Sequence, residues 1–328
     1  MLMKNAILAM TMLVLAAGCG GPSSAPATQE GGAETLDIAV IPKGLTHQFW
    51  VTVRAGAEAA AAEMGAKVIW QGPTKETEID RQINIMQDMI NRGVDGIVMA
   101  ACDENALATV VGQAGAAGIP VVTFDSGVKS EVPKSFVATD NVAGAKLAAD
   151  TLSELMGGTG EVGLIPFVPG AATSELREKG FREGLLAHPG LTLAATNYCQ
   201  SDIAIGMNVT TDMITAFPNL GGIFAANEPA AIGAAQALRG LGKAGAVKLV
   251  SFDASAEQIA ALKEGVIQAL VVQNPFKMGY EGVKAVISAV KGQEVPKVID
   301  TGVTIVTKDN VDTPVVQALL SGKAPDAK

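Results

Sequence analysis

The feature that most constrains the fold is a regular alternation of short β-rich runs with longer Ala-rich stretches. In the first half of the chain the β-rich runs are 36–41, 67–70, 96–100, 120–124 and 136–139. Helical stretches at 49–64, 76–92 and 105–117 separate them, and each is followed by a glycine: Gly65, Gly93 or Gly118. Strands joined by helical crossovers form a parallel sheet with helices on both faces. The sequence therefore predicts an α/β fold with a doubly wound parallel sheet.

The alternation then starts again, which predicts a second sheet of the same kind. Its expected strands are 161–167, 192–198, 221–226, 247–253 and 268–274. Its expected helices are 141–156, 174–187, 204–216, 229–241 and 255–264. A chain of 328 residues is also long enough for two lobes of roughly 100–150 residues each.

A further helix at 277–291 and strands near 298–300 and 303–306 follow the second sheet. We interpret them as a return to the first lobe near Asn274 and a last crossing near Gly302. With the first crossing near Thr139-Asp140, they predict two doubly wound parallel-sheet lobes joined by a three-strand hinge that permits closure. The predicted N-terminal lobe is 35–138 plus 274–302, and the predicted C-terminal lobe is 139–273 plus 303–328.

The start of the chain has the composition of an export signal. Lys4 precedes an apolar run, 6–17, which at about 1.5 Å per residue is too short to cross a bilayer of about 30 Å. The closing sequence Leu15-Ala16-Ala17-Gly18-Cys19 resembles a bacterial lipobox, although Ala16 stands where Leu is usual. We therefore predict a lipoprotein signal peptide over 1–18, acylation of Cys19, and a flexible tether over 19–34. A plain secretory signal is the alternative.

Charge and the scarcity of reactive side chains argue against several functional classes. A formal charge of -9 argues against nucleic acid or an anionic membrane surface as a binding partner. Only His47 and His188 could act as a catalytic base, and no GxSxG motif accompanies them. The GxGxxG pattern at 158–163 follows a helix and opens a strand, so it is not a dinucleotide site. Cys102 and Cys199 are expected as free thiols in different lobes, with a disulfide as the alternative. No enzymatic activity, cofactor or metal is predicted.

Ligands of open parallel sheets bind beyond the carboxyl ends of the strands. The side chains predicted there combine amines, carboxylates and amides with aromatic faces: Lys43, His47, Phe49, Trp50, Asp125, Ser126, Asn227, Asp253 and Gln273. A sugar rests its C–H face on an aromatic ring while its hydroxyls donate to carboxylates, so this set predicts a polyhydroxylated ligand. Phe49 and Trp50 would supply the flat face, and Asp125 would accept from the hydroxyls.

Structural roles stay open for several of these residues. The aromatic pair also suits the buried face of a helix, and Asp125 and Asp253 also suit helix N-caps. Arg177 is expected to pair within its own lobe. Glu228 is either a solvated surface acid or a ligand contact.

Several short motifs occur in order between residues 35 and 306. They are His47-Gln48-Phe49-Trp50, Asp125, Ala138-Thr139-Asp140-Asn141, Arg177-Glu178-Lys179-Gly180-Phe181, Asn227-Glu228-Pro229, Ser251-Phe252-Asp253 and Gln273. In these motifs the chain resembles the periplasmic ribose-binding protein family, the sugar-binding branch with the type I periplasmic binding fold. The resemblance implies two lobes that close on a ligand.

The departures from that family bear on the ligand. His47 stands for a usual Asn, Ser126 for an Arg, and Glu175 where a second ligand-contacting Arg aligns. Ser126 and Glu175 are therefore candidate ligand-binding residues, with Lys43 and Glu175 partly compensating for the missing guanidiniums. The resemblance does not extend to predicting ribose itself.

The predicted function is that of a solute-binding lipoprotein of a bacterial ABC-type importer. It would capture a small neutral monosaccharide or polyol and present the closed form to an inner-membrane permease, as a monomer anchored in the cell envelope. Which membrane carries the anchor is left open, either in the periplasm or on the outer face of the cytoplasmic membrane. The alternatives are a binding protein for a non-sugar, such as a signalling furanone, nucleoside or amide, a sensor that feeds a chemoreceptor or kinase, and an envelope enzyme. A transcriptional repressor is not expected, because no helix-turn-helix precedes the first lobe.

Overall fold

The structure is a computed structural model that describes residues 35–322. The predicted signal peptide 1–18, the predicted acylation site Cys19 and the tether 19–34 lie outside the described residues, as do 323–328. Within the described part of the chain, no helix has both the length and the apolar character needed to span a membrane.

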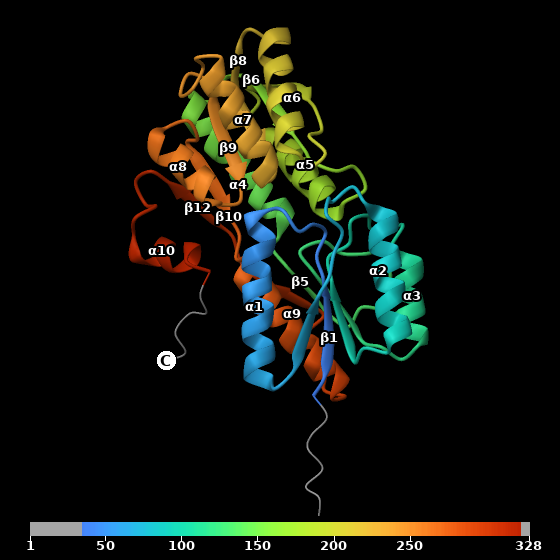
Figure 1. The fold of residues 1–328 in the computed structure, drawn as a ribbon. Helices are drawn as coiled ribbons and strands as arrows, with labels where there is room; N and C mark the ends of the chain where they lie inside the picture. The colour runs from blue at the N-terminus through green and yellow to red at the C-terminus, as the bar shows by residue number, and fades with distance from the viewer. Residues whose placement is uncertain (1–34, 323–328) are drawn as a thin grey trace, which may run out of the picture. The chain divides into compact units, whose positions relative to one another are not determined.

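Six parallel strands form the first sheet. They are β1 (Asp37–Ile41), β2 (Lys67–Trp70), β3 (Gly96–Met99), β4 (Val121–Phe124), β5 (Phe136–Ala138) and β11 (Val298–Asp300), in the spatial order β11-β5-β4-β3-β1-β2. Helices α1 (Gln48–Met64) and α9 (Pro275–Val290) cover one face, and α2 (Ile79–Arg92) and α3 (Ala108–Ala116) cover the other (Figure 1). We call this sheet with its four helices the N-terminal lobe.

The second sheet repeats the design with one reversed strand. Its strands are β6 (Gly160–Ile165), β7 (Leu191–Thr196), β8 (Leu220–Ala225), β9 (Lys248–Phe252), β10 (Ala269–Val272) and β12 (Thr304–Thr307), in the order β12-β10-β9-β8-β6-β7. Its helices are α4 (Asn141–Met156), α5 (Ala172–Leu185), α6 (Ile203–Ala216), α7 (Glu228–Gly240), α8 (Ala256–Glu264) and α10 (Pro314–Leu320). We call this sheet with its helices the C-terminal lobe. The predicted α/β fold with two parallel-sheet lobes is confirmed.

The chain passes between the two sheets at three places. It leaves β5 for α4, returns from β10 to α9, and crosses again between β11 and β12. Two of these segments lie side by side, because Thr139 Oγ1 lies 3.3 Å from Thr301 Oγ1 and 3.4 Å from the carbonyl of Gly302. At the remaining crossing Asn274 is the N-cap of α9, and its side chain accepts from the backbone N–H of Lys277 at 2.9 Å.

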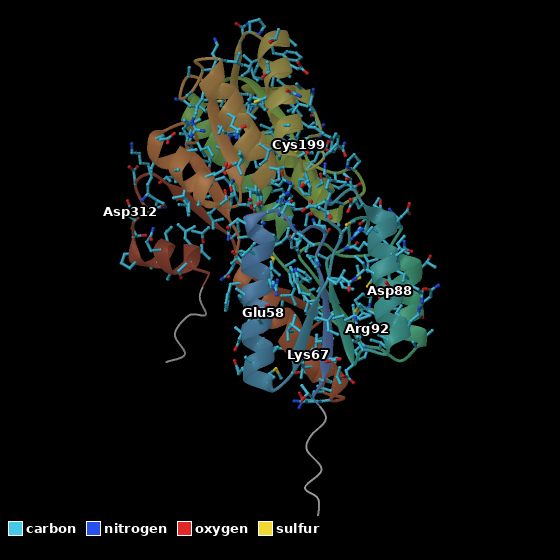
Figure 2. All side chains as sticks on the ribbon, viewed as in Figure 1. Glu58, Lys67, Asp88, Arg92, Cys199 and Asp312 are labelled. Carbon is cyan, nitrogen blue, oxygen red and sulfur yellow. The ribbon has the colours of Figure 1, made fainter. Side chains whose placement is uncertain are left out.

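Helices α1 and α9 approach each other closely through two glycines. A Cβ on Gly56 would lie 2.0 Å from the carbonyl oxygen of Phe276, and a Cβ on Gly279 would lie 2.0 Å from that of Val53. No side chain larger than hydrogen fits at either place without moving a backbone. The outer face of the opposite helix α2 is polar, with exposed Asp88 and Arg92 (Figure 2).

Some element boundaries differ from the sequence prediction for local reasons. Strand β12 pairs antiparallel with β10, and α10 was not predicted. The helix expected over 105–117 begins only at Ala108, because Asp103 Oδ1 first accepts from the backbone N–H groups of Asn105 and Ala106. The strand expected over 192–198 ends at Thr196, ahead of a turn with positive φ at Gln200 and Ser201.

Candidate functional site

The carboxyl ends of the strands in both lobes surround a cavity of about 290 Å³. It is lined by Lys43, His47, Phe49, Trp50, Glu76, Asp125, Phe167, Thr173, Arg177, Asn227, Glu228, Pro229, Asp253 and Gln273. The structure thus brings eight of the ten predicted ligand-binding residues to one place. The exceptions are Ser126 and Glu175.

A buried ion pair lies at the N-terminal side of the cavity. Lys43 is 2% exposed, and its Nζ lies 2.9 Å from Asp125 Oδ2. The same ammonium donates to Thr173 Oγ1 of the C-terminal lobe at 2.9 Å. Burial by itself lowers the pKa of Lys43, but the charges of Asp125 and Glu76 outweigh it and raise this pKa above its ordinary value. Lys43 therefore stays charged, and its ammonium contacts both Asp125 of the N-terminal lobe and Thr173 of the C-terminal lobe.

Asp125 faces the cavity because the backbone turns sharply after β4. Its φ is 52°, in the left-handed region that Asp and Asn tolerate better than other non-glycine residues. Ser126, the next residue, is fully buried outside the cavity lining, and its hydroxyl has no hydrogen-bond partner within residues 35–322. Adjacent side chains diverge at such a turn, so only Asp125 reaches the cavity.

Glu175 also lies away from the cavity. It sits in the first turn of α5, is exposed, and accepts from the backbone N–H of Gly170 at 3.1 Å. Two positions further along, Arg177 reaches the cavity instead. Residues two apart on a helix point in different directions, so the helix can present only one of them there.

Arg177 combines the structural role expected for it with a place in the cavity wall. It is 2% exposed and donates to Asn141 Oδ1 at 2.8 Å and to the carbonyl of Ala226 at 2.7 Å, both in its own lobe. Its guanidinium lies 3.9 Å from the ring centre of Phe252, a cation–π distance. The cavity therefore has a guanidinium despite the changes at 126 and 175.

The aromatic pair forms an apolar wall. The rings of Phe49 and Trp50 meet edge to face with centroids 4.9 Å apart, and Trp50 packs in the same way on Phe124 at 6.1 Å. Trp50 is 2% exposed and belongs to the hydrophobic core under α1. Trp50 therefore both packs in the core and lines the cavity, while its contact with a ligand stays a prediction.

Asp253 and Gln273 form the opposite polar wall. Asp253 Oδ1 accepts from Gln273 Nε2 at 2.6 Å, and its Oδ2 accepts from the backbone N–H of Glu228 at 2.9 Å. Burial raises the pKa of Asp253, while the charge of Arg177 and the bond from Gln273 oppose that rise. Gln273 Oε1 is buried without a hydrogen-bond partner among the described residues, so it remains as an acceptor at the cavity wall.

Glu228 bonds the two lobes together at a helix N-terminus. It is 7% exposed, and its two carboxylate oxygens accept from the backbone N–H groups of Gln48 and Phe49, each at 3.0 Å. These are the first residues of α1, whose own N-cap residue, His47, makes no side-chain cap bond. Glu228 is therefore not a solvated surface acid.

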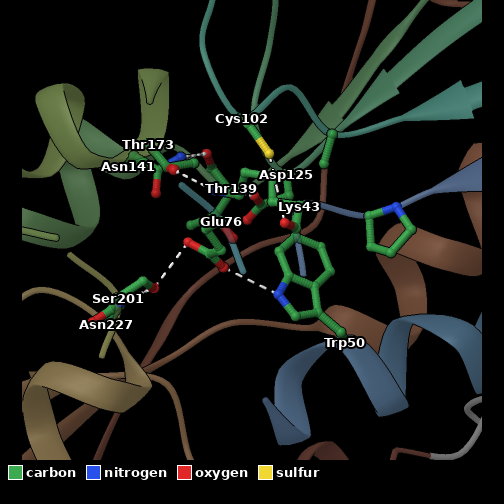
Figure 3. A network of polar contacts seen from close by, with 12 residues as sticks. Lys43, Trp50, Glu76, Cys102, Asp125, Thr139, Asn141, Thr173, Ser201 and Asn227 are labelled. Atoms are coloured by element: carbon green, nitrogen blue, oxygen red, sulfur yellow. Dashed lines mark hydrogen bonds and ion pairs between the residues drawn. The ribbon is translucent and has the colours of Figure 1, made fainter. Parts of the chain in front are cut away.

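Glu76, in the loop between β2 and α2, was missed by the sequence analysis. Its Oε1 accepts from Trp50 Nε1 at 3.1 Å, and its Oε2 accepts from Ser201 Oγ of the other lobe at 2.9 Å (Figure 3). Burial would raise its pKa, but the charge of Lys43 and the bonds from His47 and Ser201 lower it to about 2. The sequence of 74–80 is typical of the exposed start of a helix. The one indication of a site was its position after the second strand.

Cys102 and Cys199 are both buried and unpaired in the described part of the chain. Burial raises the pKa of Cys199 to about 12 and raises that of Cys102 as well, so neither forms a thiolate near neutral pH. Within residues 35–322, no group of His, Cys, Asp and Glu side chains is arranged to hold a metal ion.

The chain is similar in sequence and in structure to known proteins. Residues 38–294 match the family described as "Periplasmic binding protein domain". The D-ribose/D-allose-binding protein of Pseudomonas aeruginosa is 32% identical over 282 residues, which cover 82% of this chain and 88% of that protein.

Two solved structures are also close. An ABC transporter solute-binding protein of Agrobacterium vitis with bound D-fucose is 38% identical, with a TM-score of 0.84 over 86% of this chain and 98% of that one. A carbohydrate transporter solute-binding protein of Agrobacterium radiobacter in complex with D-arabinose is 35% identical, with a TM-score of 0.85 over 88% of this chain and 99% of that one.

Proposed function

The chain belongs to the periplasmic binding protein family, in its ribose- and sugar-binding branch, and we propose that it is the solute-binding lipoprotein of a bacterial ABC-type sugar importer. The two solved structures compared above are named as solute-binding proteins of transporters, and the Pseudomonas aeruginosa relative is named as a sugar-binding protein. The protein accordingly binds and releases its solute without changing it, and its partner is the permease of the importer. A chemoreceptor that reads the same closed form is a second partner to test.

The observation that carries this proposal is the composition of the interlobe cavity. Its four carboxylates include Asp125 and Asp253, and it also contains the amides of Asn227 and Gln273 and an aromatic wall. Carboxylates accept from hydroxyls in charge-assisted bonds worth about 1.5–3 kcal/mol each, and a ring supports the C–H face of a sugar.

We take the ligand to be a small neutral monosaccharide or polyol. The proteins compared above carry D-fucose, D-arabinose or, by name, ribose and allose, and one further relative is a xylitol-binding protein. The ligand-binding residues in this proposal are Lys43, His47, Phe49, Trp50, Asp125, Asn227, Asp253 and Gln273.

Ligand binding would couple to closure through the three crossing segments. We propose lobes of 35–138 plus 274–302 and 139–273 plus 303–328, which move about these segments. Because each lobe contributes part of the polar wall, the closed state binds a sugar more tightly than the open state, and the ligand shifts the equilibrium toward closure.

We further propose that Cys19 is acylated and tethers the binding domain through 19–34. The support is the lipobox-like sequence Leu15-Ala16-Ala17-Gly18-Cys19. In cells that process lipoproteins, the wild-type chain should incorporate labelled palmitate and sediment with membranes, whereas Cys19→Ser should do neither. Unlabelled wild-type chain in the soluble fraction would reject the anchor and leave the binding function untouched.

The binding function is tested with a panel of pentoses, 6-deoxyhexoses, hexoses and polyols. Binding to the folded state alone stabilises it by about 2.7 kcal/mol at 100 times the dissociation constant, so one or more panel members should raise the melting temperature and change Trp50 fluorescence. A panel of nucleosides, furanones and amides serves as the contrast. Stabilisation by members of that second panel alone would replace the sugar proposal with a non-sugar one.

A further inference from the structure

Glu76 is a carboxylate of the cavity whose hydrogen bonds connect the indole of Trp50 with a side chain of the opposite lobe. It is 5% exposed and accepts from Trp50 in its own lobe and from Ser201 across the gap (Figure 3). His47 Nδ1 lies 3.5 Å from the oxygen that also receives the indole N–H. A side chain held from three directions in this way has a defined position.

On the N-terminal side, Glu76 fixes the orientation of the indole. Trp50 can turn about two side-chain bonds, and its contacts with Phe49 and Phe124 are edge-to-face contacts of apolar rings. The bond from Nε1 to Glu76 Oε1 is its directional contact. Glu76 therefore determines which part of the indole the cavity presents.

On the C-terminal side, Glu76 fixes the direction of a hydrogen-bond relay. An ionised carboxylate only accepts, so the hydroxyl hydrogen of Ser201 points to Glu76 Oε2. Ser201 Oγ then accepts from Asn227 Nδ2 at 2.8 Å, and Asn227 Oδ1 accepts from the backbone N–H of Ala230 at 3.0 Å. The group that Asn227 has left for a ligand is its second amide hydrogen, a donor.

We propose, on the basis of the binding function above, that Glu76 is a specificity-determining positioning residue. It acts through Trp50 and, by way of Ser201, through Asn227. One wall of the cavity thereby presents a fixed indole face and an amide donor, which select a sugar by the position of the hydroxyl oxygen that faces this donor. The carboxylates of Asp125 and Asp253 select hydroxyl donors elsewhere around the ring.

The test compares Glu76→Gln, Ser201→Ala and the double variant with wild type. Glu58→Gln is the matched control, because Glu58 lies on the same helix as Trp50, is exposed, and pairs with Arg54 outside the cavity (Figure 2). Dissociation constants for D-ribose, D-allose, D-fucose, D-arabinose and xylitol are measured by calorimetry. The indole N–H signals of the ligand-free proteins are recorded by NMR, with Trp70→Phe used to assign Trp50.

Glu76→Gln should weaken the best-bound sugar at least about ten-fold and change the ratio between the best and second-best sugars by about as much. Ser201→Ala should change the ratio in the same direction, and the double variant should be no worse than Glu76→Gln alone, because both act through one relay. The Trp50 indole signal should move in Glu76→Gln and stay in Glu58→Gln.

Unchanged ratios between the dissociation constants of the sugars would overturn the inference. Equal weakening of every sugar is one such result, because a general structural role predicts it. If Glu76→Gln fails to fold, Ser201→Ala decides the question from the other lobe. A wild-type protein that binds no sugar defeats the proposed function instead, and the indole signal then still decides whether Glu76 positions Trp50.

Discussion

The ammonium of Lys43 lies 2.9 Å from Asp125 Oδ2, and both side chains are almost fully buried at the wall of the interlobe cavity. Lys43 follows β1 and Asp125 follows β4, so the pair joins the carboxyl ends of two strands of one sheet. Removing one member of a buried ion pair is costly, because the other charge is left in a poorly solvated place.

Asp125→Asn should therefore weaken both sugar binding and the fold. Asn tolerates the left-handed backbone at this position, so the change removes mainly the charge. The free energy of unfolding should fall by about 2–4 kcal/mol, and sugar affinity should fall at least about ten-fold. Urea denaturation and calorimetry measure the two effects. Asp88→Asn on the exposed face of α2 is the control and should change neither; a stable Asp125→Asn with full affinity would contradict the assignment.

Truncating Glu228 should weaken the contact between the two lobes. Glu228→Ala removes the acceptor for the first two backbone N–H groups of α1, a capping interaction worth about 1 kcal/mol. Sugar affinity should fall about five-fold, and the amides of Gln48 and Phe49 should exchange with solvent faster. Hydrogen exchange and stopped-flow release of the sugar measure these effects. Glu257→Ala in the exposed first turn of α8 is the control, and unchanged exchange at Gln48 and Phe49 would refute the cross-lobe cap.

Stability should depend on pH through His47. Burial by itself lowers the pKa of His47, but the bond to Glu76 and the charges of Glu76, Glu228 and Asp253 outweigh it and raise the pKa above 6.5. The folded protein then holds a proton that the unfolded chain releases, so this stabilisation is complete below pH 6.5 and is lost as pH rises through the raised pKa.

His47→Asn should accordingly flatten the fall in unfolding free energy above pH 6.5, measured by urea denaturation across that range. The control is His188→Asn, which removes the other histidine of the chain; its partner Asp150 is half exposed, so that pair contributes little. If the pH dependence of the unfolding free energy flattened only in His188→Asn, its assignment to His47 would be wrong.

The close approach of α1 and α9 predicts that alanine destabilises the protein at Gly279 but not at Gly112 of α3. Gly279→Ala should lower the free energy of unfolding by about 2–3 kcal/mol, because its Cβ would lie 2.0 Å from the carbonyl oxygen of Val53. Gly112→Ala in α3 meets nothing within 4 Å and should stabilise by about 0.5–1 kcal/mol. Urea denaturation of both variants checks the pair, and equal effects would reject the packing argument.

Much of the site follows from where strands end. The positions of Lys43, Asp125, Asn227 and Asp253 could be predicted because each lies within two residues of a strand end, and the carboxyl ends of parallel strands share one edge of a sheet. Glu76 could not be predicted in the same way, because a run of charged residues before a helix usually faces solvent. Its burial depends on Trp50 and on Ser201, which lies 125 residues further along the chain.

Local pattern therefore determined the two sheets and their strand-end side chains, since each of these depends on short stretches of chain. Packing inside the C-terminal lobe decided that Arg177 rather than Glu175 reaches the cavity and that β12 runs antiparallel. Docking of the lobes decided that Glu228 caps a helix 180 residues before it. Those contacts join segments built separately. Their geometry is set by how two preformed surfaces fit together, which no periodicity along the chain records.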